Sequence, residues 1–209
     1  MGQWALWARR LTVILLFAAL PGCGPEPSAN GKPISRALNI PDKVLVEDLE
    51  GRNVDPFEGI GEAKAQVFIF TSTDCPISNR YAPTVGRIWE DFHEKGVRFA
   101  LVYPHADLTV EEIRKHLKDF AYPCAALRDP KHLLVRKCQA KVTPEAAVFN
   151  SKGELVYHGR IDDRYVDFGK ERPDATRHDL EEVLKAVLAG KAPAQKAIRP
   201  IGCYIPDLP

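Results

Sequence analysis

One cysteine, Cys75, stands where a strand-forming segment gives way to a helical pattern. Residues 66–70 are strand formers, and the helical pattern begins at Pro76, which suits a first helical turn because the amide it lacks would have no partner there. The thiol of Cys75 is therefore expected at a helix N-terminus, where unpaired amides and the helix dipole favour a thiolate. The junction predicts a buried strand followed by an amphipathic helix, with Cys75 as a candidate nucleophile.

The composition is that of a soluble domain with extensions. Of the 209 residues, 45% are hydrophobic and 27% are charged, and the formal net charge is +1. A core of about 150 residues buries enough apolar surface to fold alone. The near-neutral charge and the absence of a basic stretch argue against a nucleic-acid partner.

The N-terminal segment has the pattern of an export signal. Arg9 and Arg10 precede a largely apolar stretch, residues 11–20, which is too short to span a bilayer as a helix. Because a cysteine follows the cleavage site, the segment resembles a bacterial lipoprotein signal in which Cys23 is lipidated. We predict a signal peptide at residues 1–23 and a lipid anchor on Cys23, with free secretion as the alternative. Residues 24–39 are predicted to form a flexible tether.

The remaining cysteines agree with export. Cys75, Cys124, Cys138 and Cys203 are an even number, as expected in a compartment where disulfides persist. Four cysteines allow three complete pairings, and the sequence alone does not choose among them.

Apolar periodicity and turn residues predict alternating strands and helices. Strands are expected at residues 43–46 and 51–54 as a hairpin, then at 66–70, 97–102, 124–127, and at 146–149 and 155–158 as a second hairpin. Helices are expected from residue 76 to about 92, 109–120, 129–138 and 179–189. This order argues for a mixed sheet with helices on both faces. Residues 191–209 carry four prolines and are predicted to form a tail without regular structure.

Three marks in this order resemble the thioredoxin superfamily, and more narrowly its redoxin branch. They are Cys75 at the strand-to-helix junction, Ala82-Pro83 within the helix, and Val142-Thr143-Pro144 before the second hairpin. The stretch 108–138 is similar to the insertion of peroxiredoxins and of membrane-tethered periplasmic thioredoxins. The resemblance covers about residues 40–190.

The resemblance implies a thioredoxin-like α/β sandwich with a mixed central sheet, helices on both faces and a redoxin-type insertion. It also implies a cis bond before Pro144, and a Thr143 backbone that binds an extended thiol substrate. Glu145 is either an acid near the thiol, as in periplasmic thioredoxins that reduce apocytochrome c, or a solvated glutamate at a strand start.

Two departures separate the chain from the thioredoxins and peroxiredoxins that it resembles. The usual Cys-x-x-Cys pair is replaced by Cys75-Pro76-Ile77-Ser78, and the Ser78 hydroxyl can hydrogen-bond a thiolate but cannot form a disulfide. Peroxiredoxins show a Pro-x-x-x-Thr-x-x-Cys pattern, whereas Phe68 and Ser72 occupy the Pro and Thr positions here. The second departure argues against a standard peroxiredoxin site.

Because Ser78 replaces the second cysteine of the usual pair, Cys203 is a candidate for the missing sulfur. We hypothesise that the tail folds back and that Cys203 resolves oxidised Cys75; a static disulfide from Cys203 to Cys124 or Cys138 is the alternative. Cys124 and Cys138 could instead staple the insertion together, form a second redox pair, or be separate core thiols.

The charged segment at residues 159–165 and the six histidines give less specific indications of function. Residues 159–165 are dense in charge, and they either orient substrate or form a local network of salt bridges and turns. The six histidines show no strong ligand spacing, and Asn79 stands where thioredoxin-like copper chaperones place a second cysteine. We therefore predict no metal site.

These observations predict an exported thiol–disulfide oxidoreductase, either periplasmic or tethered to a membrane as a lipoprotein. Cys75 would be the nucleophile, Ser78 its hydrogen-bond donor and Cys203 the resolving cysteine. The expected partners are exported protein thiols or disulfides and a redox protein that supplies electrons, with no dissociable cofactor. A thiol peroxidase and a non-catalytic assembly or metal-delivery factor are the alternatives.

Overall fold

The computed structural model describes residues 43–206 of the chain. The predicted signal peptide, the lipidation site Cys23 and the tether at residues 24–39 lie outside this range. Within the range, no helix has the length and apolar character needed to cross a membrane.

An eight-stranded mixed sheet forms the centre of the fold, in the order β11-β8-β7-β3-β4-β5-β1-β2. Its strands are β1 (Val46–Glu47), β2 (Asn53–Val54), β3 (Ala65–Phe70), β4 (Val97–Tyr103), β5 (Ala125–Arg128), β7 (Glu145–Asn150), β8 (Leu155–Gly159) and β11 (Ala197–Ile198). Strands β3, β4 and β5 are parallel, whereas β7 runs antiparallel to both β3 and β8. The two predicted hairpins are confirmed as β1–β2 and β7–β8.

Two short antiparallel pairs lie outside this sheet. One joins β6 (Val142–Thr143) to β12 (Cys203–Tyr204), and the other joins β9 (Tyr165–Asp167) to β10 (Lys170–Glu171). The first pair links the segment before Pro144 to the end of the chain.

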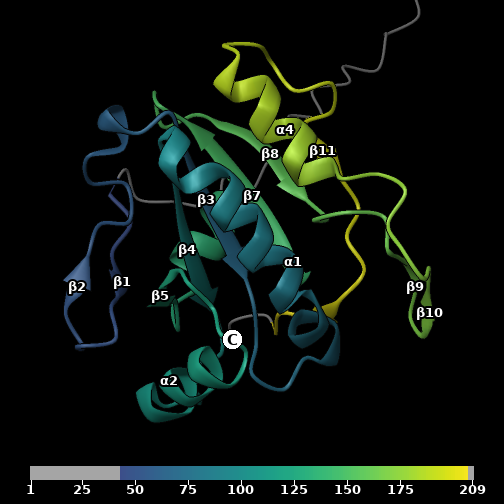
Figure 1. Ribbon diagram of the computed structural model, residues 1–209. Coiled ribbons are helices and arrows are strands. Elements are labelled where there is room, and N and C mark those ends of the chain that lie inside the picture. Colours follow the sequence, from purple (N-terminus) through teal and green to yellow (C-terminus); the bar gives the residue numbers. More distant parts are fainter. Residues whose placement is uncertain (1–42, 207–209) are drawn as a thin grey trace, which may run out of the picture. The chain divides into compact units, whose positions relative to one another are not determined.

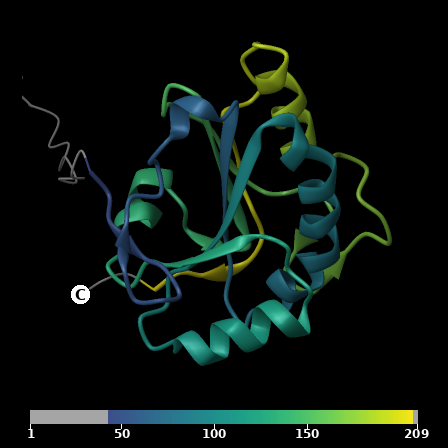
Figure 2. The same cartoon turned by 60° about the vertical axis from the view of Figure 1, so that its left-hand side comes forward.

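The helices are α1 (Pro76–Phe92), α2 (Val110–Asp119), α3 (Leu133–Cys138) and α4 (Asp179–Leu188), with 3-10 turns η1 (Ile60–Glu62) and η2 (His93–Lys95). Figure 1 shows α1 and α4 against the same face of the sheet. The turned view in Figure 2 shows α2 beyond one end of the strands rather than against a face.

The two faces of the sheet bury separate apolar clusters. One cluster packs side chains of α1 and α4 on the sheet and includes Cys75, while the other packs α3 on the opposite face and includes Cys138. The alternation of buried side chains along β3, with Val67 and Ile69 in one cluster and Phe68 in the other, explains why this strand is apolar throughout. The predicted α/β class and the helices on both faces are confirmed.

Local sequence signals explain where α2 begins. Thr109 is the N-cap, and its hydroxyl accepts a hydrogen bond from the Glu112 amide at 3.2 Å. The Glu112 carboxylate in turn accepts from the Thr109 amide at 2.8 Å. This is the capping box that the sequence predicts.

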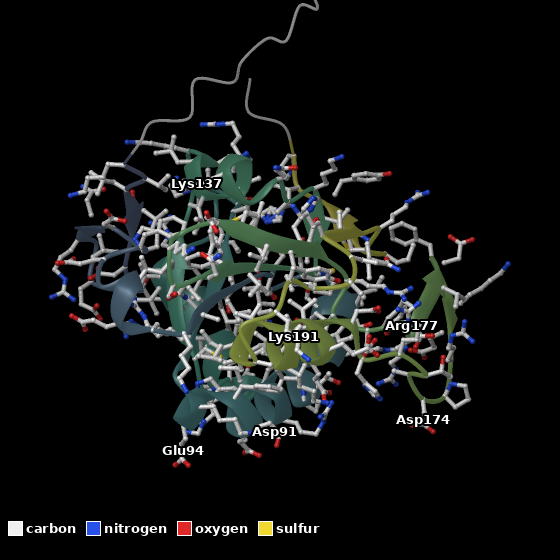
Figure 3. All side chains as sticks on the ribbon, turned by 90° about the horizontal axis from the view of Figure 1, so that it is seen from above. Asp91, Glu94, Lys137, Asp174, Arg177 and Lys191 are labelled. Carbon is white, nitrogen blue, oxygen red and sulfur yellow. The ribbon has the colours of Figure 1, made fainter. Side chains whose placement is uncertain are left out.

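Most charged side chains are exposed or half-buried. Figure 3 labels six of them: Asp91, Glu94, Lys137, Asp174, Arg177 and Lys191. Lys137 is only half-exposed, because its ammonium group lies 5.2 Å from the centre of the Phe57 ring. Several polar side chains are nonetheless buried, among them His116, Glu145 and Asp163.

The predicted absence of regular structure in the tail is wrong, because the tail contains β11 and β12. Strand β11 pairs in parallel with β8, and a Cβ at Gly159 of β8 would lie only 2.1 Å from the Ile198 carbonyl oxygen. A Cβ at Gly202 would lie 2.3 Å from the Thr143 carbonyl oxygen. Both tail contacts therefore require a glycine, and this allows a proline-rich segment to approach the backbone of the domain.

Candidate active site

Cys75 is the N-cap of α1. Its backbone is extended, Pro76 follows in the first turn, and the Ser78 amide donates a hydrogen bond to the Cys75 sulfur at 3.4 Å. The sulfur therefore takes the place of a capping oxygen and satisfies one of the amides that a helix start leaves unpaired. The predicted position of the thiol at a helix N-terminus is confirmed.

The peptide bond between Thr143 and Pro144 is cis, as predicted. This bond lies beside the sulfur, since the Cys75 thiol donates to the Thr143 carbonyl oxygen at 3.1 Å. Residues 68 positions apart in the sequence thus meet where the α1 N-terminus faces the loop before β7.

The tail brings Cys203 to the same point. Strand β12 pairs antiparallel with β6, with Cys203 opposite Thr143 and Tyr204 opposite Val142. The Ile205 amide extends the pairing by donating to the Lys141 carbonyl oxygen at 3.0 Å. The Cys203 side chain lies close enough to the Cys75 sulfur for each thiol to affect the pKa of the other. Both thiols are free in the structure.

Two hydroxyl groups complete the surroundings of the sulfur. The side chains of Ser78 and Thr143 are buried next to Cys75, and neither hydroxyl makes another hydrogen bond within the described part of the chain. A buried hydroxyl without a partner is costly, so both are available to donate to a thiolate.

The two facing sulfurs differ in acidity. Burial raises the pKa of the Cys75 thiol, but hydrogen bonds with Cys203, Ser78 and Thr143 outweigh burial and hold the pKa below the ordinary value of a cysteine. For Cys203, burial and the neighbouring Cys75 sulfur both raise the pKa, to about 12. Cys75 is therefore the sulfur that ionises first.

Glu145 lies on the other side of the loop from the sulfur. Its carboxylate accepts hydrogen bonds from the Lys141 amide at 2.8 Å and the Val142 amide at 3.3 Å, and it lies 3.3 Å from Nδ1 of His158. The side chain is buried, and its hydrogen bonds among the described residues go to these groups and not to Cys75. The prediction of a solvated glutamate is therefore wrong, and the carboxylate holds the turn that leads into β6.

Cys124 and Cys138 are separate core thiols. They belong to the apolar clusters on opposite faces of the sheet, and both are free. Burial raises the pKa of Cys124 to about 12 and that of Cys138 well above its ordinary value. Of the alternatives that the sequence left open, the structure supports neither a mutual disulfide nor a link from either thiol to Cys203.

A buried polar chain supports the active-site loop, and the sequence analysis missed it. His116 of α2 has Nδ1 2.8 Å from the Tyr103 hydroxyl and Nε2 2.8 Å from Oδ1 of Asn79, while the Asn79 amide donates to the Thr73 carbonyl oxygen at 3.1 Å. Since Asn79 Oδ1 can only accept, Nε2 carries the proton and Nδ1 accepts from the tyrosine. Burial lowers the pKa of His116, against a smaller opposing effect of Asp119. The imidazole is therefore neutral and connects α2 to both sides of Cys75.

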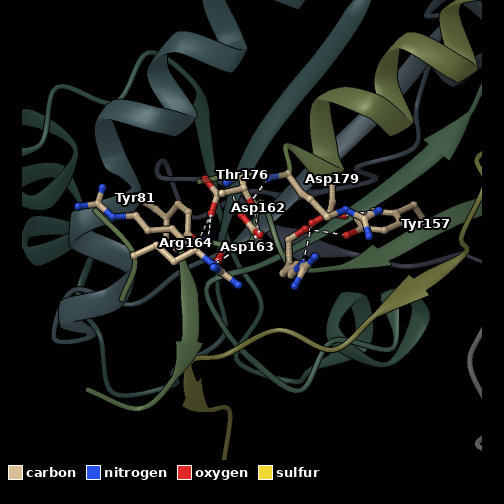
Figure 4. A network of polar contacts seen from close by, with 10 residues as sticks. Tyr81, Tyr157, Asp162, Asp163, Arg164, Thr176 and Asp179 are labelled. Atoms are coloured by element: carbon tan, nitrogen blue, oxygen red, sulfur yellow. Dashed lines mark hydrogen bonds and ion pairs between the residues drawn. The ribbon is translucent and has the colours of Figure 1, made fainter. Parts of the chain in front are cut away.

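The charged segment at residues 159–165 forms the local network that was one of its two interpretations (Figure 4). Tyr81 of α1 donates to Asp162 at 2.5 Å, and Asp163 accepts from the amide and hydroxyl of Thr176, each at 2.6 Å. Burial raises the pKa of Asp163, but these hydrogen bonds and the one from the Arg177 amide outweigh it and leave the pKa at about 2. The network joins α1 to the segment that precedes α4.

Metal ligands do not gather anywhere among residues 43–206, where no three His, Cys, Asp or Glu side chains are placed to hold an ion.

Comparisons with known proteins find similar solved structures but do not assign the chain to a family. No family model matches the chain, and no curated protein matches it. A hypothetical protein from Sinorhizobium meliloti is similar, with a TM-score of 0.67 and 24% identity over 78% of this chain and 90% of that one. An uncharacterized conserved protein from Geobacillus kaustophilus overlaps with a TM-score of 0.68 and 23% identity over 81% and 90%. A secreted disulfide oxidoreductase from Mycobacterium tuberculosis overlaps less well, with a TM-score of 0.48 and 16% identity over 71% and 96%.

The fold and the site together define the class. The strand order, the cysteine at the start of α1 and the cis Pro144 bond give this chain the thioredoxin-like fold that the sequence predicts. A C-terminal strand, β12, brings a second cysteine, Cys203, to the same site.

Proposed function

We propose that the protein is an exported thiol–disulfide oxidoreductase in which Cys75 is the nucleophile and Cys203 is the resolving cysteine. The single observation that carries the proposal is the pairing of β12 with β6, which sets Cys203 opposite Thr143 and beside the Cys75 sulfur. The tail thereby supplies the second sulfur that Ser78 cannot supply.

The acidities of the two thiols support this division of roles. The Cys75 thiolate attacks one sulfur of a substrate disulfide, forms a mixed disulfide and releases the other substrate sulfur as a thiol. Cys203 then loses its proton and attacks the Cys75 sulfur, which releases the second substrate thiol and leaves a Cys75–Cys203 disulfide. A dithiol redox partner reduces this disulfide for the next cycle.

Export is part of the proposal and rests on the N-terminal pattern. A signal peptide at residues 1–23 would direct the domain out of the cytoplasm, and a lipid on Cys23 would hold it at a membrane. The substrates are then exported proteins with thiols or disulfides.

Thiol peroxidation is a second candidate, favoured by one observation. The Cys75 residue is only 1% exposed beneath the tail, and this favours a small oxidant over a protein. A hydroperoxide would convert the thiolate to sulfenic acid and leave as an alcohol, and Cys203 would then form the disulfide and release water. The hydroxyls of Ser78 and Thr143 would donate to the new oxygen.

One set of assays tests both candidates. Insulin disulfide reduction and hydrogen peroxide consumption are measured for the wild type, Cys75→Ser and Cys203→Ser, with Cys124→Ala as the control. We expect Cys75→Ser to abolish insulin reduction, and Cys203→Ser to form a mixed disulfide that accumulates. A protein without turnover in either assay, which binds partners equally well after Cys75→Ser, would be an adaptor, and the proposal would be refuted.

Disulfide mapping of the oxidised protein provides the direct structural test. We expect a Cys75–Cys203 link in the oxidised chain. A link from Cys203 to Cys124 or Cys138 alone would remove the resolving role.

A further inference from the structure

The tail leaves the two active-site sulfurs unequally accessible. Cys75 is 1% exposed, because Gly202 and Cys203 lie over it and over the Thr143–Pro144 bond. Cys203 itself is half-buried. An external group that approaches the closed site therefore meets Cys203 before Cys75.

The surface beside the tail strand is open and partly apolar. Phe168 and Tyr204 are 57% and 75% exposed, and with Gly202 they line a hollow of about 250 Å³. Large apolar side chains exposed together are uncommon on a protein that has no partner at that surface. A protein that contacts this surface touches the tail and not the covered Cys75.

The two sulfurs also differ as leaving groups. In thiol–disulfide exchange, the sulfur with the lower pKa leaves faster. The pKa of Cys75 lies below its ordinary value and that of Cys203 is about 12, so Cys75 is the better leaving group of the pair. Accessibility and leaving-group ability thus both favour attack on the Cys203 sulfur with Cys75 as the leaving group.

We propose that Cys203 is the sulfur that external thiols attack in the oxidised protein, and that Cys75 is released as the thiolate. This inference rests on the proposed function, and it assigns the partner-facing role to the tail rather than to the cysteine at the helix N-terminus. The partner thiolate bonds to the Cys203 sulfur, the Cys75–Cys203 bond breaks, and its electron pair stays on Cys75. A second partner thiolate then attacks the partner sulfur of the mixed disulfide, and Cys203 leaves and takes up a proton.

Reduced glutathione is a suitable probe of the attacked sulfur. The full chain is oxidised with diamide, and the Cys75–Cys203 disulfide is verified by peptide mapping before glutathione is added. The reaction is stopped in acid at early times, and the protein is digested with pepsin at low pH so that disulfides do not exchange. Mass spectrometry then counts the glutathione adducts on each cysteine.

We expect about ten adducts on Cys203 for each one on Cys75, because Cys203 is the more exposed sulfur and Cys75 is the better leaving group. A variant with Cys124→Ala and Cys138→Ala should give the same ratio, since it removes transfer to the core thiols. Equal labelling, or a majority on Cys75, overturns the inference while the proposed function stands. If the mapping finds no Cys75–Cys203 disulfide before glutathione is added, the proposed function fails, and the inference fails with it.

Discussion

Gly202→Ala tests whether the tail controls access to Cys75. A Cβ at this position would lie 2.3 Å from the Thr143 carbonyl oxygen, 2.7 Å from its carbon and 3.2 Å from the Pro144 nitrogen. The first of these contacts is with a backbone oxygen that cannot rotate away, so the strand must move by about 1.1 Å or more to reach the ordinary van der Waals separation of 3.4 Å. We expect β12 to detach from β6 while the domain stays folded.

The free energy that Gly202→Ala can cost is limited by the interactions that hold the tail against the domain. Loss of two or three backbone hydrogen bonds at about 1 kcal/mol each, and exposure of the buried Ile205 side chain at about 2 kcal/mol, bounds the destabilisation at about 4–5 kcal/mol. Part of this is regained as chain entropy when the tail is released. A net effect of about 2 kcal/mol corresponds to a change of about 30-fold in the equilibrium between closed and open tail.

Alkylation of Cys75 by iodoacetamide measures this equilibrium. In a Cys203→Ser background, where the tail thiol does not compete, we expect Gly202→Ala to raise the rate of alkylation by about 30-fold if opening limits the reaction. Gly86→Ala is the matched control, because a Cβ there meets nothing within 4 Å. An unchanged rate with Gly202→Ala, together with unchanged hydrogen exchange of the tail amides, would show that the strand does not cover the thiol.

Three further predictions concern the sulfurs and the buried histidine. Ser78→Cys combined with Cys203→Ser places a second sulfur in α1, and insulin reduction should return to within about threefold of the wild type, whereas Cys203→Ser alone should stay inactive. Burial lowers the pKa of His116 below its ordinary value of 6.5. As the pH falls below about 6.5, this histidine therefore takes up a proton in the unfolded chain before it does so in the folded chain. Urea unfolding should therefore show full stability above that pH and a loss below it, and His116→Gln should weaken this dependence. Cys138→Ser should cost about 1–3 kcal/mol more than Cys138→Ala, because it buries a hydroxyl without a partner, and both should retain insulin reduction.

The sequence predicts the parts of this fold that depend on local pattern. The apolar run of β3, the helix start at Pro76 and the capping box at Thr109 are each set by neighbouring residues, and each is found where expected. The cis bond before Pro144 follows from the resemblance rather than from local pattern. These features locate Cys75 and the loop that faces it.

The rest of the site depends on contacts between distant segments. The pairing of β12 with β6 requires a glycine at position 202, because a Cβ there would collide with the Thr143 carbonyl oxygen. No local sequence pattern connects Gly202 with Thr143. The role of His116 depends on Tyr103 and Asn79, which only the folded chain brings together. One signal was present in the sequence, since His116 follows the buried Ile113 by three residues and so shares its face of α2.

The parallel pairing of β11 with β8 has a consequence for how far Cys203 can travel. We expect Ile198 to stay paired beside Gly159 when β12 detaches, and Cys203 is only five positions further along the chain. Fully extended, that span covers about 17 Å. A released Cys203 thus searches a small volume around Cys75, at a local concentration of about millimolar or higher. Ring closure with Cys75 should then outpace capture by dilute free thiols in the surroundings.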